Sequence, residues 1–315
     1  MKSLQYFGPN QAEWADRPIP EPGPGQIRAR IEGVTTCPHW DLHIMSGEPM
    51  FPGRPIPYPY QPGQPGHEAV ARVDALGPGV DGPPAGTRVA AWRDQGHERP
   101  GCYAHFNVFE ADNLLPIPED LPLEAVAPLE LAMCVQVSFD QLAQLDAVKV
   151  ARFGVTGLGP AGLIALQMAR AYGAGEVVAI DPVASRRELA LQLGADTAVA
   201  PEELDGVLDA AIDCTGLAPA VANLMEHTRR AISTFGVLRE PVPFGFRQWA
   251  GGLALLGYGS HNRSAAERAL ALVTGGQLRL APLVTHTLPL TRYAEGIELL
   301  RNKEAIKVLY LPWAE

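Results

Sequence analysis

Gly157-Leu158-Gly159-Pro160-Ala161-Gly162 is the stretch that decides the fold of the second half of this 315-residue chain. It has the spacing G-x-G-x-x-G and stands between a predicted strand over Val148–Phe153 and a predicted helix over Ala161–Tyr172. In this pattern the first glycine permits a tight turn, the second lets backbone approach a pyrophosphate, and the third lets helix pack closely on strand. Free N–H groups at the start of the helix bind phosphate oxygens. Gly157, Gly159 and Gly162 therefore predict a dinucleotide site.

The residues that follow continue an alternation of strands and helices, which favours a parallel sheet covered by helices on both faces. A strand over Glu176–Ile180 leads into Asp181, 24 residues after Gly157. A carboxylate there accepts hydrogen bonds from the adenosine ribose and repels a 2′-phosphate, which favours NAD over NADP. Arg186 and Arg187 leave NADP open, because they are either first-turn helix residues or cations that accommodate the 2′-phosphate.

Residues 1 to about 125 have a different pattern. Short apolar segments such as Gln26–Ile31, Ala69–Leu76 and Arg88–Trp92 are separated by loops rich in Gly and Pro. Short strands with frequent turn signals are typical of a small β-barrel or sandwich. Leu123–Leu145 is then predicted as one helix that leads into the strand–helix half.

Composition argues against several classes of protein. The net charge is −10 and no Lys/Arg-rich run occurs, which argues against nucleic acid or an anionic membrane as partner. No apolar stretch is long enough to span a bilayer, and the first residues do not resemble a signal peptide. The four cysteines fit neither a disulfide framework nor a C-x-x-C zinc clip, so a reducing, cytoplasmic setting is expected.

Cys37, His67, Glu68 and Glu130 offer thiolate, imidazole and carboxylate groups. These are the ligand types of a catalytic zinc, where three protein groups leave one position open for water or substrate. A plainer interpretation also fits the residues, since a single Cys in a β domain is commonly core filler and a Glu on a helix commonly faces solvent. The spacing alone leaves both interpretations open.

The order of these motifs resembles the medium-chain dehydrogenase/reductase superfamily, in its zinc-type alcohol and polyol dehydrogenase branch. The resemblance covers nearly the whole chain. It implies an α/β protein with a GroES-like β-barrel catalytic domain and a Rossmann domain with a doubly wound parallel sheet. The expected ranges are 1–131 with 259–315 for the first domain and 132–258 for the second. The matching motifs are Cys37…Asp41-Leu42-His43, Gly66-His67-Glu68, Glu130, the Gly157 stretch with Asp181, Asp213-Cys214-Thr215-Gly216, and the ending at Ile306-Lys307.

The resemblance also implies a role for each matching residue. Cys37 and His67 fall on two zinc ligands, and either Glu68 or Glu130 completes the set. His43 falls on a histidine that passes the substrate proton to solvent. The cofactor positions are Gly157, Gly159, Gly162, Asp181, Arg186, Thr215 and Lys307.

Two departures from the family pattern bear on the chemistry. Cys37 and Asp41 are separated by one residue more than usual, so His39, Thr35 or Thr36 either contacts the substrate hydroxyl or is an ordinary polar residue of its loop or strand. The family's structural-zinc lobe with four close cysteines is replaced by the short segment Asp94–Gly101, so one catalytic zinc and no structural zinc are expected.

The implied activity is zinc-dependent hydride transfer between an alcohol or polyol and NAD(H), in a homodimer or homotetramer. Two alternatives remain at this stage. One is a zinc-free reductase of quinones or enones from the same superfamily, and the other is a nucleotide-binding protein without catalysis. The sequence does not identify the substrate.

Overall fold

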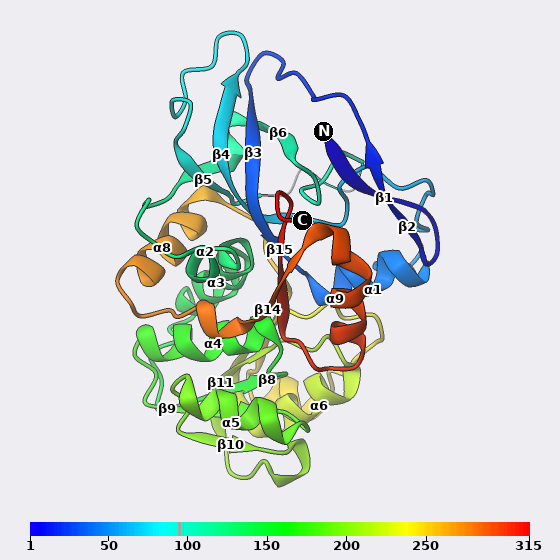
Figure 1. Cartoon of the computed structure of the whole chain (residues 1–315). Helices are drawn as coiled ribbons and strands as arrows, with labels where there is room; N and C mark the ends of the chain where they lie inside the picture. Colours follow the sequence, from blue (N-terminus) through cyan, green and yellow to red (C-terminus); the bar gives the residue numbers. More distant parts are fainter. Residues whose placement is uncertain (94–95, 97) are drawn as a thin grey trace. The chain divides into compact units, whose positions relative to one another are not determined.

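The computed structural model describes residues 1–93, 96 and 98–315; Asp94, Gln95 and His97, within the segment expected to replace the structural-zinc lobe, lie outside the described residues. The chain forms two compact units (Figure 1). Unit 1 comprises Met1–Leu131 and Leu280–Glu315, and unit 2 comprises Ala132–Arg279. The sequence analysis places the return to the first domain at residue 259, whereas the structure keeps residues 259–279 with unit 2.

Unit 2 is built on a six-stranded parallel sheet in the order β10-β9-β8-β11-β12-β13. Counted along the chain this is the order 3-2-1-4-5-6 of a doubly wound dinucleotide-binding sheet. The strands are β8 (Arg152–Thr156), β9 (Glu176–Ile180), β10 (Thr197–Val199), β11 (Leu208–Asp213), β12 (Thr228–Thr234) and β13 (Ala254–Leu256). The helices are α4 (Pro160–Ala171), α5 (Ala184–Gln192), α6 (Ala218–His227), α7 (Phe246–Ala250) and α8 (Arg263–Thr274). The predicted fold of this half is confirmed.

Two predicted elements need correction. The strand before the glycine stretch runs over Arg152–Thr156 rather than Val148–Phe153, in register with β9 from the pair Arg152–Glu176 onward. The single helix over Leu123–Leu145 is two helices, α2 (Leu123–Val126) and α3 (Leu129–Ala143). Pro128 separates them, because proline lacks the backbone N–H that a continuous helix would need at this position.

Unit 1 contains a mainly antiparallel sheet in the order β14-β15-β3-β4-β5-β7, with β6 paired to β3. The strands are β3 (Gln26–Thr35), β4 (Glu68–Leu76), β5 (Arg88–Ala91), β6 (Phe106–Glu110), β7 (Leu114–Pro116), β14 (Val284–Pro289) and β15 (Lys307–Leu311). A separate hairpin pairs β1 (Lys2–Gly8) with β2 (Gln11–Asp16), and the helices α1 (Pro38–Ser46) and α9 (Tyr293–Arg301) accompany the sheet. The predicted β-rich first half is confirmed.

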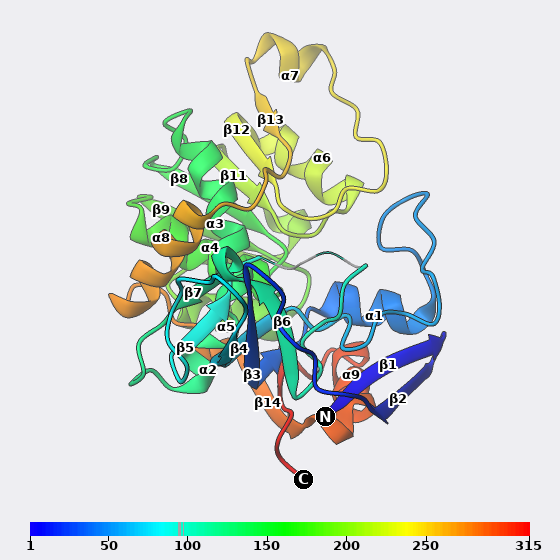
Figure 2. The same ribbon diagram turned by 90° about the horizontal axis from the view of Figure 1, so that it is seen from above.

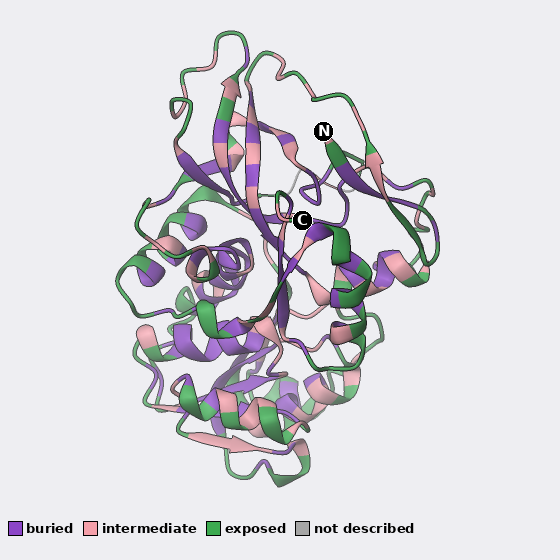
Figure 3. Cartoon of the chain, viewed as in Figure 1, coloured by how far each residue is buried: buried purple, intermediate pink, exposed green. Residues whose placement is uncertain are grey.

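Each unit has its own hydrophobic core, drawn in purple in Figure 3. In β3, Ile27, Ala29 and Ile31 are fully buried and alternate with partly exposed residues, as expected when one sheet face packs on the core. In unit 2, α7 extends beyond the edge strand β13 (Figure 2). Within the described ranges, none of the helices is both apolar and long enough to cross a bilayer.

Candidate functional site

The four residues with metal-binding side chains come together in unit 1. Cys37 stands at the N-cap of α1, His67 directly precedes β4, and Glu130 lies in the first turn of α3. The Cys37 sulfur, a ring nitrogen of His67 and a carboxylate oxygen of Glu68 lie within 4.8 Å of one another. Glu130 Oε2 lies 4.0 Å from His67 Nε2. Segments far apart in the sequence therefore converge on one small cluster.

Backbone contacts fix the orientation of His67. The Pro65 carbonyl lies 2.8 Å from His67 Nδ1. A carbonyl only accepts hydrogen bonds, so Nδ1 carries hydrogen and the lone pair of a neutral ring is on Nε2, the atom nearest Glu130. A second hydrogen bond of this kind is how proteins orient a metal-binding histidine.

Cys37 is held by a buried carboxylate that the sequence analysis did not select as a site residue. Asp41 Oδ2 accepts the Cys37 backbone N–H at 2.9 Å. The same carboxylate accepts the hydroxyls of Tyr103 at 2.9 Å and Tyr293 at 2.7 Å. With the extra residue after Cys37, Asp41 lies one helical turn later and its side chain reaches back to the N-cap. Tyr293 is 252 residues from Asp41 in the chain, so no local pattern could reveal this contact.

The charges of this cluster act strongly on one another. Burial acts to lower the pKa of His67, but the Cys37 sulfur and the carboxylates of Glu130 and Glu68 raise it well above its usual value. Burial raises the pKa of Asp41 to about 6, although Tyr293 and Tyr103 donate hydrogen bonds that favour its ionised form. The His67 imidazole is therefore surrounded by groups that are negatively charged when ionised, namely one thiol and two carboxylates.

Glu68 has a cationic partner of its own. Lys307 Nζ donates to Glu68 Oε1 at 2.6 Å and Oε2 at 2.5 Å, and to the Thr36 carbonyl at 2.7 Å. The Thr35 hydroxyl also donates to Glu68 Oε2, at 2.7 Å. Burial raises the pKa of Glu68, and the charge of Lys307 opposes that shift.

These contacts give Lys307 a partner other than the expected cofactor pyrophosphate. Its side chain has no exposed surface, and its ammonium has three acceptors for its three hydrogens. Lys307 is therefore the counterion of Glu68 and has no remaining donor for a cofactor pyrophosphate.

The residues expected to contact the substrate hydroxyl or carry its proton lie on or beside α1. The Thr35 hydroxyl donates to Glu68, and the Thr36 hydroxyl accepts the Val308 N–H. His39 is exposed, whereas His43 is buried with Nδ1 3.0 Å from the Glu48 carbonyl. The two imidazole rings lie edge to face, 5.7 Å apart.

In unit 2 the glycine stretch forms the turn between β8 and α4. Gly157 has φ of 83°, and a Cβ atom there would lie 2.5 Å from the Thr215 methyl. A Cβ atom on Gly162 would lie 1.9 Å from the Gly157 carbonyl oxygen, so helix and turn pack too closely for any side chain. A Cβ atom on Gly159 would meet nothing within 4 Å. This open space beside Gly159 would allow a phosphate to approach the backbone closely.

Asp181 follows β9 and faces the same turn. Its carboxylate accepts the backbone N–H of Leu158 at 2.7 Å and of Val183 at 2.8 Å, which leaves further lone pairs for a ribose. Arg186, in α5, has its guanidinium 3.9 Å from Asp181 Oδ2. Thr215 donates its hydroxyl to Asp213 at 2.6 Å. The expected cofactor positions of unit 2 therefore surround one turn, whereas Lys307 belongs to unit 1.

The donor set of unit 1 fits a zinc ion. Thiolate, imidazole and carboxylate are all present, and the ring nitrogen that would bind the ion carries the lone pair. Because Lys307 balances Glu68 and the Asp41 carboxylate is taken up by the Cys37 N–H and two tyrosine hydroxyls, Cys37 and Glu130 are the acids left to bind an ion, and their two negative charges match one divalent cation.

Both units match known protein families. Residues 23–119 match the alcohol dehydrogenase GroES-like domain, and residues 160–275 match the zinc-binding dehydrogenase domain. The chain is 29% identical to an L-threonine 3-dehydrogenase of Anaeromyxobacter sp., over 99% of both chains. The structure of 2R,3R-butanediol dehydrogenase from Bacillus subtilis has a TM-score of 0.85 at 20% identity and 99% coverage of both chains. A structure described as an NAD-dependent alcohol dehydrogenase gives a TM-score of 0.82 at 27% identity, again with 99% of both chains covered.

Proposed function

Because this chain belongs to the zinc-type branch of the medium-chain dehydrogenase/reductase superfamily, we propose that it transfers hydride between an alcohol or polyol and NAD(H). The observation that carries this proposal is the cluster of Cys37, His67 and Glu130 in unit 1, in which Glu130 is buried and the other two are partly buried. In such enzymes the cofactor performs the hydride chemistry, and the protein supplies binding, orientation and electrostatic stabilisation.

We assign Cys37, His67 and Glu130 as the zinc ligands and Glu68 as a neighbouring, non-ligating carboxylate. The assignment rests on charge and on hydrogen bonding, because both Glu68 oxygens already accept bonds from Lys307. Zinc held by such a set supplies Lewis-acid polarisation of a substrate oxygen. Pro65 orients His67, and Asp41 orients Cys37 through its backbone N–H.

His43 is the residue that we propose moves the substrate proton. The Glu48 carbonyl accepts a hydrogen bond from Nδ1, so Nε2 is the ring atom that takes up and releases the proton. His39 is the weaker candidate because it is exposed on the first turn of α1.

NAD is the proposed cofactor, with its pyrophosphate on the turn at Gly157, Gly159 and Gly162 and its adenosine ribose on Asp181. Support comes from the open space beside Gly159 and from the carboxylate fixed by Leu158 and Val183. The negative charge of Asp181 repels the 2′-phosphate of NADP, although Arg186 nearby reduces that repulsion.

We further propose that unit 2 carries the contact between subunits. Among the described residues, the edge strand β13 pairs with β12 alone, and α7 beyond it exposes Phe246 (78%) and Trp249 (71%). An unpaired strand edge beside large exposed apolar side chains is typical of a surface that pairs with a second chain.

An activity assay tests the proposed reaction. Formation of NADH is followed by absorbance with a panel of alcohols and polyols, including L-threonine and butanediol, and then with NADP in place of NAD. We expect NAD-dependent oxidation that is lost in Cys37→Ser and kept in Cys214→Ser, which makes the same chemical change elsewhere. Oxidation that survives Cys37→Ser, or NADPH-dependent quinone reduction by metal-free protein, would contradict the proposal.

A further inference from the structure

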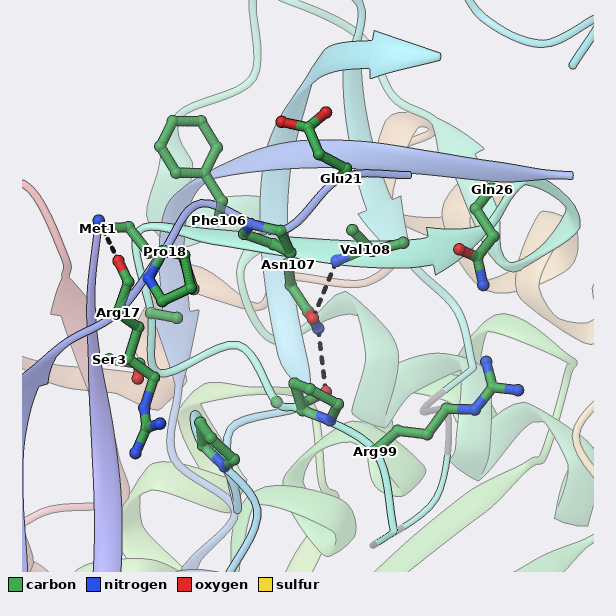
Figure 4. A pocket seen from close by; sticks show the side chains of 15 residues that line it. Met1, Ser3, Arg17, Pro18, Glu21, Gln26, Arg99, Phe106, Asn107 and Val108 are labelled. Atoms are coloured by element: carbon green, nitrogen blue, oxygen red, sulfur yellow. Dashed lines mark hydrogen bonds between the residues drawn. The ribbon is translucent and has the colours of Figure 1, made fainter. Parts of the chain in front are cut away.

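Unit 1 contains a second concave site that shares no lining residue with the Cys37–His67–Glu130 cluster. It is a cavity of about 470 Å³, lined by β1, the segment after β2, the loop around Arg99 and the strand β6 (Figure 4). This volume lies in the range of natural small-molecule sites, which span roughly 300–1,000 Å³. Nothing in the proposed dehydrogenase reaction uses this cavity.

One wall of the cavity carries an uncompensated positive charge. In the described part of the chain, no carboxylate lies within ion-pair distance of the Arg17 guanidinium. The other ionic side chains of the cavity are paired, since Arg99 contacts Glu110 at 2.8 Å and Glu21 contacts Arg28 at 3.2 Å. In a chain with a net charge of −10, a guanidinium without a carboxylate partner at a cavity wall favours an anionic ligand.

Two buried polar atoms on this wall also lack partners. Ser3 is fully buried, and among the described residues neither Ser3 Oγ nor Arg17 Nε has a hydrogen-bond partner. In Figure 4, Ser3 and Arg17 lie on the same side of the cavity, away from Arg99 and Gln26. An unsatisfied buried donor costs about 1–3 kcal/mol, so two of them at one wall indicate a ligand that would accept both bonds.

The rest of the lining is largely apolar. Pro18, Pro62, Pro100 and Phe106 contribute hydrocarbon and ring surface to the cavity. The polar side chain of Asn107 is already used, since its Oδ1 accepts the Val108 N–H at 2.9 Å and its Nδ2 donates to the Pro100 carbonyl at 3.3 Å. A ligand for this site therefore needs an apolar body in addition to its anionic group.

We propose that this cavity binds a small organic carboxylate. The carboxylate pairs with the Arg17 guanidinium, and rotation of the Arg17 and Ser3 side chains on binding brings the buried Nε and Oγ into hydrogen-bonding contact with its oxygens. The apolar body packs against the prolines and Phe106. Carboxylate and guanidinium form short, charge-assisted hydrogen bonds, which suits the wall at Arg17. The inference does not depend on the zinc site or on the proposed reaction.

The proposal is tested with 2-naphthoate as probe, by isothermal titration calorimetry on the full chain. Its uncharged analogue, 2-naphthamide, shows how much of the binding requires the carboxylate. Arg17→Gln removes the charge, and Arg54→Gln is the matched control, because Arg54 is exposed in the same unit and does not line the cavity. We expect Arg17→Gln and the amide each to weaken binding by about tenfold or more, with Arg54→Gln unchanged.

Ser3→Ala gives a second test with two measurements, the melting temperature of the ligand-free protein and the affinity for 2-naphthoate, which should not decrease together. Removal of an unpartnered buried hydroxyl should leave the melting temperature of the ligand-free protein unchanged or higher. The same change should weaken 2-naphthoate binding by about fivefold, because a hydrogen bond to the carboxylate is lost. Absence of binding at millimolar 2-naphthoate, or equal binding by wild type and Arg17→Gln, would overturn the proposal.

Discussion

Replacement of Lys307 by methionine tests the buried Lys307–Glu68 ion pair, which is the reason that Glu68 is not assigned as a zinc ligand. Both side chains are buried, with exposures of 0% and 1%, and the ammonium makes all of its hydrogen bonds inside unit 1. Methionine is similar in length but carries neither charge nor donor. Among the described residues, the variant therefore leaves the buried Glu68 carboxylate with the Thr35 hydroxyl as its remaining hydrogen-bond donor.

The expected loss is large. Removal of one partner of a buried ion pair costs about 3–5 kcal/mol, because the remaining charge is uncompensated. For a unit of this size each kcal/mol lowers the melting temperature by about 2–4 °C, so a decrease of about 6–20 °C is expected. Arg292→Met is the control: it breaks the exposed Arg292–Glu295 pair and should cost less than about 1 kcal/mol.

The loss of stability in the Lys307→Met variant should depend on pH in a predictable direction. Burial already raises the pKa of Glu68, and loss of Lys307 removes the strongest charge that opposes this shift, so that His67 is the remaining opposing charge. A carboxyl group whose folded-state pKa is raised contributes stability below its unfolded pKa and loses it as pH rises through the folded value. The variant should therefore be closest to wild type in acid and furthest from it at alkaline pH.

Thermal unfolding with a chelator present separates this effect from metal binding. The double variant Lys307→Met/Glu68→Leu should recover most of the loss, because it removes both charges and keeps the site apolar. A single variant within about 1 kcal/mol of wild type at alkaline pH would refute the reasoning, and so would a loss that grows in acid.

Three further predictions follow from the other contacts. Gly159→Ala should fold normally but bind NADH at least about tenfold more weakly in a fluorescence titration. Gly162→Ala should instead destabilise unit 2, because its Cβ meets the Gly157 carbonyl. Equal effects of the two variants on NADH binding and on stability would contradict the assigned roles. Burial raises the pKa of Asp41 to about 6, so the stability that this group contributes below about pH 4 is lost as pH rises through 6. In chelator-treated protein, the unfolding free energy of wild type relative to Asp41→Asn should therefore fall by about 3 kcal/mol over that pH range. A difference that does not change with pH would be inconsistent with this burial. Trp249→Asp should reduce the assembly to monomers in light scattering after gel filtration, and an unchanged mass would exclude α7 from the interface.

Local patterns predicted much of the fold. The strand over Glu176–Ile180 has the same limits in the structure as in the sequence analysis, because it is a short apolar run between clear turn signals. The turn at Gly157–Gly162 could also be predicted from the sequence, since the glycine spacing reflects a positive φ at Gly157 and close packing at Gly162. The break at Pro128 could also have been predicted, because a proline inside an apolar run commonly ends a helix.

The contacts within the candidate metal site depend on tertiary structure instead. Lys307 and Glu68 are 239 residues apart, and only the pairing of β15 with β3 and of β3 with β4 brings them together. The resemblance therefore placed Lys307 in a family position without showing its partner. The partner of Tyr103 likewise could not be predicted from the sequence, because its role depends on the hydroxyl it donates to Asp41, 62 residues away.

Zinc content is the measurement that tests the central claim most directly. Elemental mass spectrometry of wild type, Glu130→Gln and the charge-balanced double variant Lys307→Met/Glu68→Gln distinguishes the two glutamates. We predict about one zinc per chain in wild type and in the double variant, and its loss in Glu130→Gln. Zinc retained by Glu130→Gln and lost from the double variant would contradict the assignment of ligands, and absence of zinc from wild type made with ample metal would contradict the proposed mechanism.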